Sequence, residues 1–160
     1  MNRFRTYIFV ILIPLIQSCA SHQYALNPVG GNTTWSPSND SVVVLVGFNS
    51  DKPIAGMTGG SIPTFLFDLD TLNVAAIHRK ANEPFKLEQV TFLGGINQTL
   101  VGKFENAHAL EFTKPGIYYY GHVVVRDKEV RLNAKYNDDV IGIAKKQYSY
   151  VFELLEPVNF

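Results

Sequence analysis

The chain has 160 residues, of which 46% are hydrophobic and 18% are charged. This composition is too apolar and too weakly charged for an intrinsically disordered protein, and the length suits a single folded domain. Lys and Arg total 14, as do Asp and Glu, so there is no basic field that would attract nucleic acid. The single cysteine excludes both an internal disulfide and a zinc site built from several cysteines.

The N-terminal segment has the layout of a secretory signal peptide. Arg3 and Arg5 precede an apolar run at residues 7–16, and small residues follow it. A helix of that length is too short to cross a hydrocarbon core of about 30 Å. We therefore expect residues 1–18 to be removed. The mature chain then has 12 basic and 14 acidic residues, a net charge of −2.

The end of this segment, "IQSC" at residues 16–19, has an aliphatic residue three positions before the cysteine and a small residue directly before it. It resembles the lipobox of bacterial lipoproteins, and the resemblance covers only the first twenty residues. It implies that the sulfur of Cys19 carries a diacylglycerol, and that the new amino terminus is acylated as well. Several acyl chains, such as palmitate, anchor a protein firmly, whereas one chain binds a membrane only marginally. The alternative is an ordinary signal peptide with an accidental cysteine.

The residues after Cys19 indicate where in the cell the protein is located. Ser21 stands in place of an aspartate that would act as a retention signal, and in proteobacterial lipoproteins the lack of this signal implies sorting to the outer membrane. The resemblance therefore implies a lipid-anchored protein of the cell envelope, at the outer membrane of a Gram-negative bacterium. Residues 19–40 are rich in Asn, Ser, Thr, Gly and Pro and show no periodicity, so we interpret them as a flexible tether.

Residues 41–160 are predicted to form the globular domain, and most of it has the pattern of short β-strands. Runs of β-branched and aromatic residues alternate with turn-forming segments at near-regular spacing, which favours a mainly β fold, an antiparallel sandwich. The pattern "F-x-x-PG-x-Y-Y" at residues 112–119 resembles a strand turn of small bacterial lipoproteins with immunoglobulin-like sandwiches. The predicted strands are 41–48, 62–69, 72–78, 85–93, 98–104, 109–112, 117–125 and 130–134.

The C-terminal segment 138–155 fits two structures. Asn137 or Asp138 can cap a helix, and apolar residues recur at helical spacing up to Leu155, before Pro157. Tyr148, Tyr150, Phe152 and Leu154 also alternate as in a strand. We predict a C-terminal helix, with a strand as the alternative.

Three aromatic side chains form a candidate binding surface. Successive strand residues point to opposite faces, so Tyr118, Tyr120 and His122 are expected on one face and Tyr119 on the other. If that face meets solvent, the strip suits a protein or glycan partner. The alternative is that these tyrosines stabilise the sheet as aromatic cross-strand pairs.

The titratable residues give weak signals for a metal. Asp68 and Asp70 could present two oxygens to calcium, but a tight turn explains them better. His108 and His122 could meet across neighbouring strands, yet the short histidine spacing typical of zinc sites is absent from the sequence. We therefore predict no metal, no cofactor and no catalytic residue.

These observations favour a non-catalytic, lipid-anchored envelope protein whose sandwich is a binding or structural module. It would contact the membrane through the acyl chains on Cys19 and would not bind nucleic acid. The alternative is a small periplasmic or surface enzyme, or a metal-binding protein, with a site that has no recognisable motif. Motifs such as G-x-S-x-G, H-E-x-x-H and the P-loop are absent from the sequence.

Overall fold

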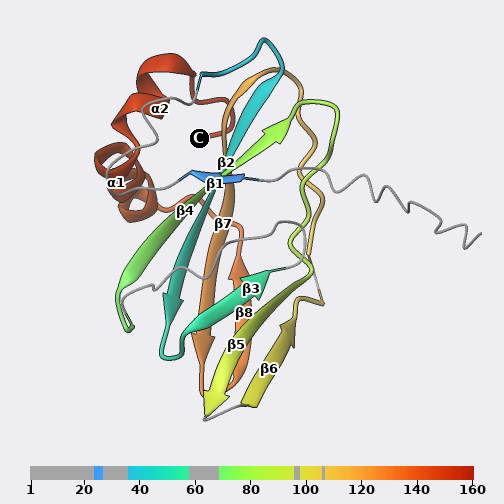
Figure 1. Ribbon diagram of the computed structural model, residues 1–160, viewed down its shortest axis with the longest axis vertical. Helices are drawn as coiled ribbons and strands as arrows, with labels where there is room; N and C mark the ends of the chain where they lie inside the picture. The colour runs from blue at the N-terminus through green and yellow to red at the C-terminus, as the bar shows by residue number, and fades with distance from the viewer. Residues whose placement is uncertain (1–23, 27–35, 58–68, 96–97, 106) are drawn as a thin grey trace, which may run out of the picture.

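The computed structural model describes residues 24–26, 36–57, 69–95, 98–105 and 107–160. Its core is formed by two sheets packed face to face, with two helices on the outer side of the larger sheet (Figure 1). The mainly β sandwich with a C-terminal helix is thus confirmed. The larger, five-stranded sheet has the order β1 (Tyr24–Leu26), β4 (Leu72–Lys80), β2 (Ser41–Ser50), β7 (Gly116–Arg126) and β8 (Glu129–Asn133). The three-stranded sheet has the order β3 (Ile54–Met57), β5 (Gln89–Gly95) and β6 (Gln98–Lys103).

Strand β2 lies at the centre of the molecule because both of its faces are covered. Val42, Val44 and Phe48 pack toward the three-stranded sheet, whereas Val43 and Leu45 pack toward the helices. All five side chains are fully buried. This explains why the sequence of β2 is an unbroken apolar run rather than an alternating one, since such runs are typical of strands that are covered on both faces.

The larger sheet is not entirely antiparallel. β2 pairs with β4 in the antiparallel sense but with β7 in the parallel sense, Val43 facing Ile117. A parallel pair needs a crossover connection, and here the chain between β2 and β7 contributes β4 and all of the three-stranded sheet. The prediction of a purely antiparallel sandwich was therefore wrong at this central pair.

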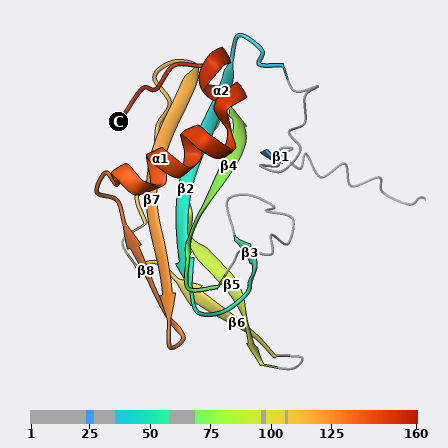
Figure 2. The same cartoon turned by 90° about the vertical axis from the view of Figure 1, so that its left-hand side faces the viewer.

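The C-terminal segment is helical, and the strand alternative was wrong. Helix α1 spans Asp138–Gln147 and α2 spans Ser149–Leu154. Asn137 caps α1, because its side-chain oxygen accepts hydrogen bonds from Asp139 N (3.0 Å) and Val140 N (3.3 Å). Figure 2 shows α1 lying across β7, β2 and β4. Tyr148, between the helices, is fully buried and donates a hydrogen bond to Val74 O at 3.1 Å.

Several predicted strands differ from the structure, and the predicted strand 85–93 corresponds to β5 only from residue 89 onward. Residues 24–26, inside the predicted tether, form β1 and pair with β4. Residues 109–112 form only an isolated bridge, Leu110 with Phe85, instead of a strand. Strand β3 was missed, because Gly56 and Met57 lack the β-branched signal. Most of the predicted strand 62–69, and Cys19 itself, lie outside the described residues.

The C-terminal tail completes the edge of β7 where β8 does not reach. Ile117 N donates to Glu156 O (2.8 Å), and Val158 N donates to Ile117 O (2.9 Å). The side-chain amide of Asn159 then accepts from Tyr119 N at 2.7 Å and donates to Tyr119 O at 3.0 Å. The amide thus takes the place of a neighbouring strand at this position.

Candidate functional site

The predicted aromatic strip does not lie on the surface. Tyr118, Tyr119 and Tyr120 are all buried, with at most 4% of each residue exposed. Both faces of β7 are covered, by the three-stranded sheet on one side and the helices on the other. The premise that Tyr118 and Tyr120 face solvent was therefore wrong, and the sheet-stabilising alternative describes them better.

A β-bulge also separates His122 from the tyrosines. Leu45 faces Tyr119 and Val46 faces Gly121, so Tyr120 is an extra residue in β7. After the bulge the alternation is reversed: Tyr118 and Tyr120 pack with Val123 toward the three-stranded sheet. His122 is then on the helix side of β7, next to Gly47. A Cβ atom added to Gly47 would lie 3.4 Å from the Cδ2 atom of His122. Glycine suits the bulge because Gly121 has φ +155°.

The three tyrosine hydroxyls each attach a different segment to β7. Tyr118 Oη accepts from Thr113 N (3.0 Å) and donates to Lys114 O (2.8 Å), which fixes the turn before β7. Tyr119 Oη donates to Lys135 O at 3.1 Å. Tyr120 Oη accepts from the buried Leu87 N at 3.0 Å. These bonds explain the three tyrosines structurally, without a ligand.

The histidines do not assemble a metal site. His108 stacks on Tyr120, with ring centroids 4.7 Å apart, on the side of the three-stranded sheet. His122 is on the opposite face of β7, so the two do not meet. Burial lowers the pKa of His122, and its buried Nε2 atom has no hydrogen-bond partner among the described residues. Among the described residues, no group of three His, Cys, Asp or Glu side chains could hold a metal ion.

Asp70 is explained by a turn and an ion pair. It adopts φ +59° and accepts a hydrogen bond from Arg126 Nη1 at 2.8 Å. The turn interpretation of this acidic pair is thus confirmed for Asp70, whereas Asp68 lies outside the described residues.

One serine–histidine contact has the residue types of a nucleophilic pair. Ser41 Oγ lies 3.3 Å from His78 Nε2. However, Ser41 is only 1% exposed, and its Oγ accepts a hydrogen bond from Ser38 N at 2.7 Å. Asp40 accepts a hydrogen bond from the hydroxyl of Ser38 at 2.5 Å. A substrate cannot reach the Ser41 hydroxyl, so these contacts stabilise the start of β2 instead.

The sandwich is open along one side, between β6 and β8. Each is an outermost strand of its sheet in the described part of the chain. The two strands are in contact at Gly102 and Val130. The approach is so close that a Cβ atom added to Gly102 would lie only 2.0 Å from Val130 Cγ2. Beside this contact is a space of about 350 Å³, the inter-sheet hollow. It is lined by Lys103, Phe104, Glu105, Val130, Arg131 and Leu132.

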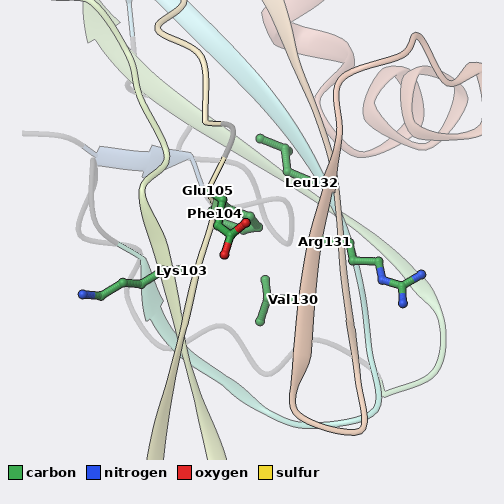
Figure 3. Close-up of a pocket in the computed structure, with 6 residues that line it drawn as sticks. All are labelled: Lys103, Phe104, Glu105, Val130, Arg131 and Leu132. Atoms are coloured by element: carbon green, nitrogen blue, oxygen red, sulfur yellow. The ribbon is translucent and has the colours of Figure 1, made fainter.

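The side chains around the inter-sheet hollow differ in direction. In Figure 3, Phe104, Glu105 and Val130 lie in the gap between the two strands, whereas Lys103 and Arg131 point away from it in opposite directions. Phe104, Val130 and Leu132 are partly buried and pack against the core. The hollow is therefore lined by apolar side chains and by the carboxylate of Glu105, with Lys103 and Arg131 directed away from it.

A second space lies on the other face of the same hairpin. This outer hollow has a volume of about 290 Å³. Its charged lining is already paired in part, since Arg131 Nη2 lies 2.8 Å from Glu129 Oε2 and Arg126 binds Asp70. The side chains of Glu129 and Arg131 are 70% and 79% exposed. The outer hollow is lined by Val124, Arg126, Asp127, Glu129 and Arg131.

The sequence predicted β8 but not this site. Val130, Leu132 and Ala134 alternate with Arg131 and Asn133, which correctly indicated a strand with one apolar face. Nothing in that alternation shows that the strand lies at an edge, because its neighbours are set by long-range pairing. The polar, charged face was the one available signal of an edge strand.

Comparisons of the chain with models of protein families, with curated proteins and with solved structures found no match. No helix in the described part of the chain is long and apolar enough to cross a membrane.

Proposed function

We propose that this protein is a lipid-anchored envelope protein whose β-sandwich is a non-catalytic binding module. The lipobox-like "IQSC" supports the anchor, and the open side of the sandwich supports the binding role. The two packed, mostly antiparallel sheets are also consistent with an immunoglobulin-like sandwich. The proposed location is the outer membrane of a Gram-negative bacterium, with the membrane contact made by acyl chains on Cys19.

One observation supports the binding role above all. The open side of the sandwich combines a hollow of about 350 Å³, lined by both apolar and charged side chains, with an outermost strand of each sheet in the described part of the chain. Pockets that bind ligands are commonly apolar, begin at about 300 Å³, and carry a few polar groups that orient the ligand. The inter-sheet hollow matches this description in volume, and its lining contains Phe104, Val130 and Leu132 together with the charged Lys103, Glu105 and Arg131. The aromatic strip proposed from the sequence does not match it, because its tyrosines are buried.

The anchor is tested by changing Cys19 to Ala. If the sulfur carries the lipid, Cys19→Ala removes the acylation site, and the lipoprotein signal peptidase, which acts on the lipidated form, leaves residues 1–18 attached. The wild-type protein should incorporate labelled palmitate and partition into the detergent phase, since several acyl chains bind firmly. The variant should incorporate none and should migrate as the longer precursor.

A neighbouring substitution is the matched control. Ser21→Ala keeps the cysteine and should be labelled and processed like the wild type. Normal cleavage of the Cys19→Ala variant, with release of a soluble protein, would contradict the anchor and would support an ordinary signal peptide.

A further inference from the structure

We propose that β1 holds the sandwich close to the membrane, with the end at which β4 stops and β2 begins facing the lipid headgroups and the inter-sheet hollow facing away from them. The partner of this end is the lipid surface into which the acyl chains insert. The inference rests on the proposed anchor at Cys19, and it adds the distance and the orientation of the domain.

The length of chain between Cys19 and β1 provides the first argument. β1 begins at Tyr24, so only residues 20–23 separate it from the lipidated cysteine. A chain extends at most about 3.5 Å per residue, so the Cα atom of Tyr24 lies within roughly 18 Å of that of Cys19. A free tether that ran from Cys19 to the start of β2 would reach about four times as far. The pairing of β1 with β4 therefore makes the connection to the membrane short.

The direction of β1 decides which end of the sandwich is close to the anchor. β1 is antiparallel to β4, and its first residue, Tyr24, faces His78, near the end of β4. The chain therefore enters β1 from the side on which β4 ends. β2 begins on this side too, since Ser41 faces Lys80. We call this side the proximal end.

The inter-sheet hollow lies at the diagonally opposite corner of the larger sheet. β1 and β8 are the outermost strands of this sheet in the described part of the chain, and Val130 on β8 is level with Ser50, the last residue of β2. With about 4.8 Å between strands and about 3.3 Å per residue along them, Val130 lies roughly 30 Å from Tyr24. Figure 1 shows β1 in the upper half of the molecule and β8 in the lower half. A domain held at the corner near Tyr24 thus leaves the hollow open to partners in the aqueous phase.

The side chains of the proximal end suit lipid headgroups. The segments before β2, after β4 and before β7 meet there around a space of about 490 Å³. Asn39, Asn82, Lys80 and Lys114 are exposed, and the two lysines offset the exposed carboxylate of Asp40. The large exposed hydrophobic side chains of the described residues lie elsewhere. Amide and ammonium groups donate hydrogen bonds to the phosphate and ester oxygens of lipids, so this end should rest on the headgroups without inserting.

Energy transfer from the domain to the lipid surface tests the orientation. Because the acyl chains occupy the sulfur of Cys19, an introduced cysteine is the only free thiol and can carry a donor dye. The lipidated protein is reconstituted in vesicles of phosphatidylethanolamine and phosphatidylglycerol, with an acceptor dye on a small fraction of the headgroups. Asn82→Cys labels the proximal end, and Arg131→Cys labels the hollow; both native side chains are exposed.

Transfer should be about twofold or more stronger from Asn82→Cys than from Arg131→Cys, because the two positions lie at opposite ends of the strands. Equal transfer from the two positions would mean that the domain lies flat on the lipid, and would overturn the proposal.

Two insertions of the same Gly/Ser sequence separate the role of β1 from that of a free tether. A segment of about twelve residues placed between Gln23 and Tyr24 adds about 20 Å of random-coil reach before β1, and should lower the transfer from Asn82→Cys about twofold. The same segment placed between Gly30 and Gly31, after β1, is the matched control. It should change the transfer little, since β1 stays paired with β4. Equal effects of the two insertions, or no effect of the first, would overturn the proposal.

Release of β1 should make the control insertion effective. Proline at both Tyr24 and Ala25 removes backbone donors on both sides of the strand and should detach it from β4. The domain should stay folded, as checked by circular dichroism, because β1 is a three-residue strand at the edge of its sheet. In this background the insertion between Gly30 and Gly31 should lower the transfer as much as the insertion before Tyr24. If it still has no effect, β1 does not limit the distance and the proposal is wrong.

Palmitate labelling and flotation with the vesicles report on the anchor separately. A protein that is unlabelled and does not float would refute the anchor and this inference together. A protein that is labelled and floats, but responds equally to the two insertions, would refute this inference and leave the anchor intact.

Discussion

The two sheets differ in how completely they are covered. The five-stranded sheet has the three-stranded sheet on one face and α1 and α2 on the other, so the side chains of its central strands are buried on both sides. The three-stranded sheet buries Val90 and Phe92 on its inner face but exposes Leu93 and Val101 by 43% and 53%. Among the described residues, the larger sheet thus contributes more fully buried side chains than the smaller one. The smaller sheet and the open edge have groups available for contact.

The largest expected effect on the free energy of unfolding comes from truncating a leucine to alanine in the larger sheet, compared with the same truncation in the smaller sheet. Leu45 is fully buried between β2 and the helices, whereas Leu93 is 43% exposed on β5. Leu45→Ala should lower the free energy of unfolding by about 2–5 kcal/mol, because it leaves a cavity in a packed layer. Leu93→Ala should change it by about 0.5 kcal/mol or less. Urea denaturation measures both, and similar losses would show that the exposed leucine is covered in solution.

An intermediate effect is expected where β7 binds the segments that flank the smaller sheet, before β5 and after β6. Tyr120, on β7, accepts a hydrogen bond from the buried Leu87 N and donates to His108 O at 2.9 Å. Tyr120→Phe keeps the ring but leaves the Leu87 N–H unpaired, which should cost about 1–3 kcal/mol.

Tyr118→Phe is the control for this change. The amides that bind Tyr118 Oη, those of Thr113 and Lys114, lie in a partly exposed turn where water can replace the hydroxyl. Tyr118→Phe is therefore expected to lower the free energy of unfolding by less than Tyr120→Phe does. Equal losses of stability in the two variants would mean that the hydrogen bonds of Tyr120 contribute no more than those of Tyr118.

The predictability of this fold differs from element to element. Strand β2 and the terminal helices were predictable, because an unbroken β-branched run and a capped helical period are local signals. The face on which His122 lies was not predictable, because one bulge at Tyr120 moves every later side chain of β7 to the opposite face of the sheet. Gly121, a glycine within an aromatic strand, was the available signal for that bulge. The open edge depends on which distant strands pair, and a single sequence does not show this.

The smallest expected effect concerns the layer between α1 and the larger sheet. Burial lowers the pKa of His122, so the folded protein binds a proton less readily there than the unfolded chain, whose histidine titrates near 6.5. The stability contributed by the neutral ring is fully present above about pH 6.5 and is lost as the pH falls toward the lowered pKa. The melting temperature should therefore fall on mild acidification.

His122→Gln should make the melting temperature less dependent on pH in this window. Part of the dependence should remain, because burial also lowers the pKa of His78. The matched control is His108→Gln, which removes a histidine from the opposite side of β7. The melting temperatures are measured between pH 7.5 and pH 5. If their pH dependence is the same in His122→Gln as in the wild type, the dependence does not arise from His122.

The parallel pairing of β2 with β7 has a consequence for how the chain folds. Val42 faces Gly116, so the two central strands meet only after the whole intervening chain has been made. Contacts between residues so far apart in sequence form slowly, because a long loop must close first. If the leader directs export, a chain that emerges from the N-terminus cannot assemble its centre until β7 has crossed.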